Sequence, residues 1–216
     1  MNLFEEHYAT LQAVVQEKLS NASGCHDYDH TLRVCRNAEL LAAELPAADL
    51  RIVRLAALLH DIARPEEMAA KGTLCHAELG AEIAKKLLEE RFEPDFADRV
   101  SAAVRTHRYR DDNRPQTLEA EIVYDADKLD SLGAVGVGRA FLFAGRENAR
   151  LHNTAEEALN SLAYSREDTA YREYLVKLRY LPESMLTAPG KRIAMERAGF
   201  MHDFFEQLEK ETAFSS

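Results

Sequence analysis

The sequence is short of the features that mark secreted, membrane-spanning or low-complexity proteins. Its three cysteines, Cys25, Cys35 and Cys75, are odd in number and contain no CxxC pair, which argues against a disulfide framework. Nine glycines and six prolines in 216 residues are too few for a disordered chain. The N-terminus lacks a basic-then-apolar signal, and no apolar run approaches the length of a membrane span. These absences predict a cytoplasmic protein with no membrane partner.

Positive charge is also scarce. Lysine and arginine number 27 against 37 aspartates and glutamates, for a formal net charge of -10. Because phosphate contacts supply most of the non-specific affinity for nucleic acid, we do not expect such binding here. The local charge of a bound metal ion outweighs a distant acidic field, so a small phosphorylated substrate remains compatible with this composition.

Helix-forming residues are what the chain has in abundance. Hydrophobic residues make up 46% of it, alanine, leucine and glutamate are frequent, and no segment alternates as a strand does. We therefore predict an all-α fold, a single compact helical bundle over residues 1–216. The expected helices cover about 3–19, 26–45, 50–64, 76–90, 96–107, 118–130, 132–143, 155–164, 168–181 and 189–208. Asp49, Thr117 and Thr187 are the expected caps of three of them, and Asp27 or Asp29 of a fourth.

The most informative stretch is the apolar run 55–63, which ends in the adjacent His60 and Asp61. Burying an unpaired imidazole or carboxylate costs several kcal/mol, roughly, so these side chains need a partner. A metal ion is the simplest one. The side chains of neighbouring residues on a helix point about 100° apart, so His60 and Asp61 can both reach one ion only from the same side of that ion. The other ligands must come from elsewhere.

Other helices offer such ligands at positions that continue an apolar row. His30 shares a helical stripe with Val34 and Ala38, and Asp127 follows Val123 by four residues. His76 and His107 occupy equivalent in-line positions further along the chain. A lone histidine on an apolar face is more often a hydrogen-bonded core residue, but several together favour a metal site built between helices.

The order of these residues, His30, then His60-Asp61, then Asp127, resembles the H…HD…D signature of the HD-domain metal-dependent phosphohydrolases. Segments 26–34, 56–63 and 125–134 are similar to the bacterial subgroup of small stand-alone HD hydrolases, and so are 177–178, 185–187 and 194–197. The resemblance implies an HD core at about 22–135, with C-terminal helices at about 136–212 packed on it. It breaks at 171–174, where relatives often carry a His-Phe pair.

By this resemblance the metal ligands are His30, His60, Asp61 and Asp127. His76 and His107 match histidines that in some HD proteins hold a second metal and in others face substrate phosphates. The ligand set admits Mn²⁺, Mg²⁺, Co²⁺ or Fe²⁺ and does not decide between them or between one ion and two. Thiolate ligation by Cys25 or Cys75 is conceivable, but a cysteine packed as a small hydrophobe is the favoured interpretation.

We expect catalytic roles for Asp61, Lys128 and Asp130, and substrate binding by Arg33 and Arg105. Lys128 could approach a phosphate oxygen, and Asp130 could orient the water or a ligand. A helix-surface ion pair is about as good an explanation for Lys128 and Asp130, and a solvated loop environment for Arg105.

The function predicted is hydrolysis of a small phosphate ester or anhydride, most plausibly a nucleotide, by metal-activated water. The subgroup resemblance favours pyrophosphate release from a nucleoside triphosphate over removal of a single phosphate. Two alternatives remain: a di-iron oxygenase on the same scaffold, if His76 and His107 complete a six-ligand set, and a non-catalytic nucleotide-binding regulator. The exact substrate, the oligomeric state, with a homodimer as one option, and the roles of His26, Asp27 and His152 stay open.

Overall fold

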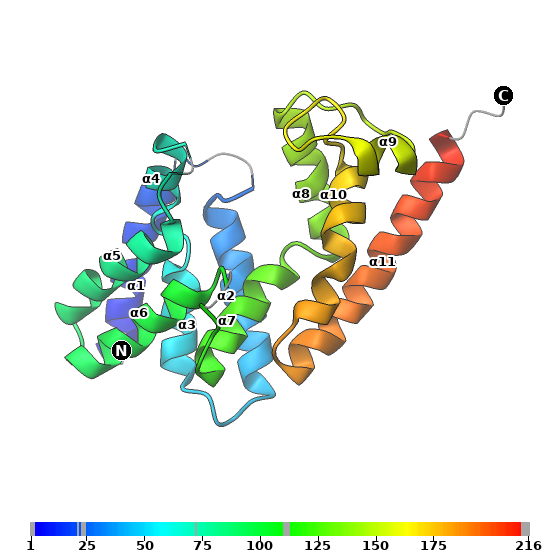
Figure 1. The fold of residues 1–216 in the computed structure, drawn as a ribbon. Coiled ribbons are helices and arrows are strands. Elements are labelled where there is room, and N and C mark those ends of the chain that lie inside the picture. Colours follow the sequence, from blue (N-terminus) through cyan, green and yellow to red (C-terminus); the bar gives the residue numbers. More distant parts are fainter. Residues whose placement is uncertain (1–2, 21, 23–24, 72, 110–112, 213–216) are drawn as a thin grey trace. The chain divides into compact units, whose positions relative to one another are not determined.

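The computed structural model describes residues 3–20, 22, 25–71, 73–109 and 113–212, and within these ranges the chain is helical and contains no strand (Figure 1). The all-α prediction is confirmed. The chain separates into two compact units, Met1–Asp127 and Lys128–Ser216. Their boundary falls within helix α7 (Leu118–Leu129). The single-domain organisation stays a prediction.

The first unit is organised around a short, apolar helix. It contains α1 (Leu3–Leu19), α2 (Tyr28–Ala43), α3 (Leu50–Leu59), α4 (Arg64–Ala69), α5 (His76–Glu89), α6 (Pro94–Thr106) and most of α7. Helices α1, α2 and α6 all pack against α3, and α5 packs against α6. Seven of the ten residues of α3 are buried: Ile52, Val53, Leu55, Ala56, Ala57, Leu58 and Leu59. Because α3 is buried to its last residue, the turn that comes directly after it also lies in the interior.

The predicted helix caps are confirmed. Asp49 accepts a hydrogen bond from the backbone amide of Arg51 at 3.0 Å and so begins α3. Thr117 and Thr187 do the same for α7 and for α11 (Ala188–Thr212), accepting from backbone amides at 3.2 and 3.0 Å. Asp27 caps α2 by accepting from the amide of His30 at 2.9 Å, which fixes the backbone of that histidine.

One predicted helix is too long. We expected the helix that begins after Asp49 to carry His60 and Asp61, but α3 ends at Leu59 and both residues lie in the turn after it. The reason is Pro65, which has no amide hydrogen and cannot continue a helix but suits a first turn. It sits in the first turn of α4, so a separate helix begins at Arg64, and most of it lies outside the helices expected from the sequence.

The second unit contains the end of α7, α8 (Gly133–Arg146), α9 (Ala155–Asn160), α10 (Ala170–Val176), the 3₁₀ helix η1 (Leu178–Ser184) and α11. Helix α11 packs along α8 and η1, and α10 packs against α8 and α9. The stretch 168–181, predicted as one helix, is interrupted at Lys177, whose backbone leaves the helical region (φ -143°, ψ -60°). Phe205 fills the interior of this unit, with its ring 4.6 Å from that of Tyr174.

Gly133 and Gly136 of α8 stand at positions of close packing, and Gly138 does not. A Cβ atom at Gly136 would lie 2.3 Å from the carbonyl oxygen of Ser131, and Gly133 combines a positive φ of 70° with a close approach to Arg197. Gly138 has no described atom within 4 Å of the place of a Cβ. None of the described helices is both long and apolar enough to cross a membrane.

Candidate metal centre

Six predicted ligand residues meet in the first unit. His30 is on α2, His60 and Asp61 come directly after α3, and Asp127 is on α7. His76 is the first residue of α5, and His107 comes directly after α6. Every one of these side chains except Asp127 is at most 2% exposed, and 18% of the Asp127 side chain is exposed. Residues up to 97 positions apart thus converge on one buried point, and their polar atoms need a common partner.

The first group of ligand atoms comes from His30, His60, Asp61 and Asp127. The Nε2 atoms of His30 and His60 lie 3.3 Å apart. Asp61 Oδ2 is 3.6 Å from each of them, and Asp127 Oδ1 is 3.4 Å from His30 Nε2. The ligand atoms of His30, His60 and Asp127 all lie within 4.8 Å of one another, and Asp61 Oδ2 lies beside both of these imidazole nitrogens.

The second group uses the other oxygen of the same aspartate. Asp61 Oδ1 lies 3.2 Å from His76 Nε2 and 3.6 Å from His107 Nε2, and these two nitrogens are 3.1 Å apart. Asp61 thus presents one oxygen to each pair of histidines. This is the arrangement that a carboxylate adopts when it bridges two ions.

The protonation of the rings shows that the residues fit a cation. The Nδ1 atom of His60 is 2.7 Å from the carbonyl oxygen of Ala57, and that of His107 is 2.6 Å from the oxygen of Val104. A carbonyl oxygen only accepts, so each Nδ1 carries the proton and each Nε2 presents a lone pair. Cis ligands at about 2.1 Å from an ion lie about 3 Å apart, close to the separations found here. A divalent cation therefore suits both groups.

Burial keeps these histidines neutral. It lowers the pKa of His60 to about 3 and also lowers that of His107, in spite of the adjacent Asp61. For Asp61, burial opposes the charged form, but the positive charge of the Arg64 guanidinium beside it holds its pKa well below the usual range. Neutral imidazoles beside an ionised carboxylate are the protonation states that metal binding requires.

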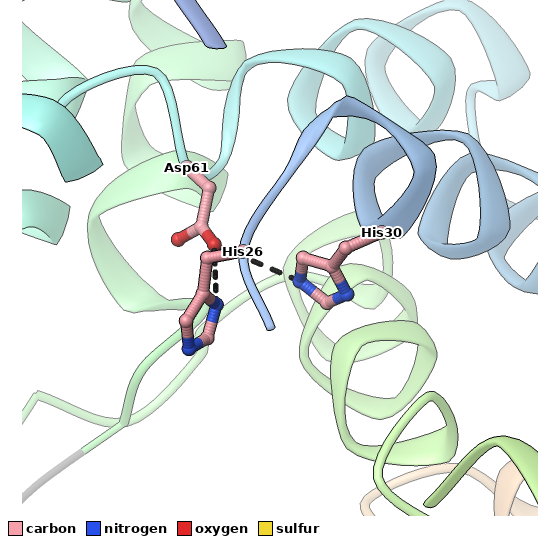
Figure 2. Close-up of side chains that lie close together, drawn as sticks. All are labelled: His26, His30 and Asp61. Carbon is pink, nitrogen blue, oxygen red and sulfur yellow. Dashed lines mark hydrogen bonds and ion pairs between the residues drawn. The ribbon is translucent and has the colours of Figure 1, made fainter. Parts of the chain in front are cut away.

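His26 is a contact of the centre whose role the sequence left open. Figure 2 shows its ring beside Asp61 and His30, with Nδ1 3.1 Å from Asp61 Oδ2. Its side chain is 31% exposed, so it lies at the edge of the centre. Burial lowers its pKa to about 4, although Asp61 acts in the opposite direction. Its place directly before Asp27, the cap of α2, is the signal that could have pointed to it.

Glu67 is the residue that sequence reasoning missed. It lies on α4, is 8% exposed, and accepts from three side chains: His76, Arg64 and Arg108. Burial opposes its charge, but the hydrogen bond from His76 and the two guanidinium groups lower its pKa to about 2. The one signal for it in the sequence is the polar pair Glu66-Glu67, five and six residues after Asp61.

The other predicted site residues have different surroundings. Arg33 is half-buried on α2, one turn after His30. Arg105 pairs with Glu78 on the wall of a cavity of about 330 Å³. Lys128 is half-buried in the second unit, where Asp130 is buried and paired with Arg139. Among the residues that the structure describes, no cysteine joins a group of three metal-ligand atoms. Cys25 is buried, as expected of a packed cysteine, but Cys75 is exposed, so packing as a small hydrophobe is wrong for Cys75.

Comparison with known proteins agrees with this geometry. The family model described as HD domain matches residues 27–132. The Bacillus subtilis protein YpgQ is 34% identical over 204 residues, 91% of this chain and 89% of that one. Ribonuclease Y of Chloroflexus aurantiacus is 33% identical over 148 residues, 68% of this chain but only 25% of that protein.

Solved structures are similar over almost the whole chain. A protein described as a predicted HD superfamily hydrolase, from an uncultured Thermotogales bacterium, superposes with a TM-score of 0.69 at 30% identity, covering 98% of this chain and 99% of that one. The crystal structure of Bacillus subtilis YpgQ in complex with ADP has a TM-score of 0.74 at 29% identity, covering 98% and 97%.

Proposed function

The chain belongs to the HD superfamily of hydrolases, and we propose that it is a metal-dependent phosphohydrolase acting on a small phosphate ester or anhydride. The observation that carries the proposal is the position of Asp61, buried between two pairs of imidazoles with one oxygen toward each. A divalent ion held there supplies Lewis-acid stabilisation of a phosphoryl oxygen and a nucleophilic water at neutral pH.

The protein's own residues then have distinct tasks. His30, His60, Asp61 and Asp127 hold the first ion, and His76 and His107 with the second oxygen of Asp61 hold a second one. The ions proposed are Mn²⁺, Mg²⁺, Co²⁺ or Fe²⁺. The buried setting of these ligands excludes bulk water and so strengthens each electrostatic contact. Arg33 and Lys128 remain our candidates for contacts to phosphate.

A nucleotide is the substrate class that we favour. A cavity of about 330 Å³, a volume typical of small-molecule sites, is lined by residues next to His76 and His107 in sequence, among them Cys75, Arg108 and Tyr109. Guanidinium groups such as those of Arg105 and Arg108 suit phosphate, and an aromatic ring suits a base. The related YpgQ binds ADP in its crystal structure. Within this class we propose pyrophosphate release from nucleoside triphosphates.

Turnover by metal-stripped protein resupplied with one ion at a time tests the proposal. The substrates are nucleoside mono-, di- and triphosphates and a generic phosphate ester, and the readouts separate phosphate from pyrophosphate. We expect pyrophosphate release that needs both the ion and an intact His60-Asp61 pair, with His60→Ala and Asp61→Ala as inactive controls. Protein that binds the ion stoichiometrically but releases neither product from any substrate contradicts the proposal.

A second candidate is a di-iron oxygenase, and one observation favours it. The four histidines lie around the carboxylate of Asp61, with one of its oxygens toward each pair, and a shared carboxylate of this kind is what a di-iron centre requires. Iron content of protein purified without chelator, together with oxygen consumption, separates the two functions. Hydrolysis supported by Mn²⁺ or Mg²⁺ in the absence of oxygen excludes the oxygenase as the main activity.

A further inference from the structure

Three fully buried histidines of the centre, His60, His76 and His107, do not orient their rings in the same way. His60 and His107 each come directly after the last turn of a helix and donate to the carbonyl three residues back, Ala57 and Val104. Carbonyls of a last turn have no partner within the helix, so they are available for this purpose. These two rings are fixed by their own helices.

His76 is not preceded by a helical turn whose carbonyl its ring could reach. It is the first residue of α5, and Cys75 before it has extended backbone, with φ -88° and ψ 112°. The turn that serves His60 and His107 therefore does not exist at this position. Without an acceptor from another segment, the His76 ring would be fixed neither in orientation nor in tautomer.

Glu67 supplies the acceptor from α4. Its Oε2 lies 2.9 Å from His76 Nδ1, and both residues are buried. Arg108 Nη1 also approaches the same nitrogen, at 3.3 Å, but lies closer to Glu67 Oε1, at 2.6 Å. The shorter contact and the negative charge favour donation from His76 to Glu67. The Nε2 lone pair of His76 then faces Asp61 and His107.

The carboxylate is itself held in place. Arg64 Nη1 donates to Glu67 Oε2 at 2.6 Å, and Arg64 Nε donates to Asp61 Oδ1 at 3.1 Å. Together with Arg108 on the other oxygen, this leaves Glu67 little freedom to rotate. Arg64 and Glu67 are three residues apart on α4, so this short helix presents both to the centre.

We propose that Glu67 is a positioning residue of the second ion site, which fixes His76 with Nδ1 protonated and Nε2 toward the ion. The inference rests on the proposed two-ion function of the centre. A charged acceptor behind a metal-bound histidine changes metal affinity by about 10–100-fold. The first ion site contains neither His76 nor Glu67, so the change expected in its affinity is smaller and is transmitted through the shared Asp61.

Two variants and a matched control test the role by metal binding. Titration calorimetry with Mn²⁺ on metal-stripped protein is expected to show two sites in the wild type. Glu67→Ala lowers the affinity of one site about 10–100-fold, and Glu67→Gln, which keeps a neutral acceptor, lowers it less. The control is Glu66→Gln, adjacent on α4 but paired with Lys18, and is expected to bind as the wild type does. Equal affinities in all four proteins overturn the proposal.

The ¹⁵N chemical shifts of His76 in metal-free protein give a readout that does not depend on binding. We expect the Nδ1-protonated tautomer in wild type and Glu67→Gln, and a loss of that preference in Glu67→Ala. A wild-type His76 protonated at Nε2 overturns the proposal whether or not ions bind. If wild type does not bind Mn²⁺ but His76 has the expected tautomer, the two-ion function is contradicted and the contact between Glu67 and His76 is supported. If Glu67→Ala does not fold, the near-isosteric Glu67→Gln supplies the comparison.

Discussion

The Nε2 atoms of His76 and His107 lie 3.1 Å apart. Because His107 Nδ1 donates to the carbonyl oxygen of Val104, its Nε2 presents a lone pair to His76. Two lone pairs at this distance repel unless a cation lies between them. We predict that His107→Ala removes one of two bound ions while His30, His60 and Asp127 keep the other. Metal content per protein chain, measured after dialysis, is expected to fall from about two to one. His152→Ala, at a histidine of the second unit, is the control, and an unchanged content in His107→Ala contradicts the assignment.

Asp130 is predicted to stabilise the fold, because it is buried and its Oδ2 lies 2.8 Å from Arg139 Nη1. Removing one partner of a buried ion pair costs about 3–5 kcal/mol, since the other charge stays buried. Asp130→Asn is therefore expected to lower the free energy of unfolding in urea by that order, with kcat changed less than about threefold in the folded fraction. Asp98→Asn, in an exposed pair with Lys85, is expected to cost no more than about 1 kcal/mol. If the Asp130→Asn protein is as stable as wild type but inactive, the stability role is contradicted and the catalytic role expected from the sequence is supported.

The N-cap of α3 is predicted to make stability depend on pH. The hydrogen bond and charge of Arg51 lower the pKa of Asp49 below its ordinary value of 3.8. The stabilisation by the ionised cap is therefore present above about pH 4 and is lost as pH falls through the lowered pKa. Asp49→Ala is expected to cost about 0.5–2 kcal/mol at pH 7.

Asp49→Asn isolates the charge, because asparagine caps a helix without ionising. The difference in unfolding free energy between wild type and Asp49→Asn is expected to shrink between pH 5 and pH 2. Urea titrations at several pH values measure it. A difference that stays constant over this range contradicts the role of the charge.

His26 is predicted to tune the first ion site without being needed for it. Its Nδ1 contacts Asp61 Oδ2, so His26→Ala removes a hydrogen bond from a shared ligand. We expect Mn²⁺ affinity to fall about 10–100-fold with an unchanged number of ions. Loss of one ion from the His26→Ala protein would instead identify His26 as a ligand. His202→Ala, an exposed histidine on α11, is the control.

Much of the centre was predictable because its ligands obey a simple physical rule. His30 and Asp127 continue apolar helical rows, and His60-Asp61 ends the most hydrophobic run in the chain. A polar side chain in a row that faces the core must find a partner there. The caps at Asp49, Thr117 and Thr187 were predictable for a similar reason, since short hydroxyl or carboxyl side chains satisfy first-turn amides.

The features that escaped prediction depend on contacts between distant segments. Glu67 stands in a polar segment, and only the fold reveals that His76, Arg64 and Arg108 surround it. We predicted the end of α3 too far along the chain, because Pro65 lies in the first turn of the next helix, α4. Asp130 and Arg139 are nine positions apart, too far for a helical pair, so a turn had to bring them together.

A shared carboxylate also has a thermodynamic consequence. If Asp61 offers one oxygen to each of two ions, as we propose, the binding of either ion changes the surroundings of the other, and the two affinities are coupled. Linkage requires that the first ion alter the affinity of the second by the same factor in either order of binding. The metal content of this protein is then a cooperative property of the pair, and a single intrinsic dissociation constant will not describe its titration curve.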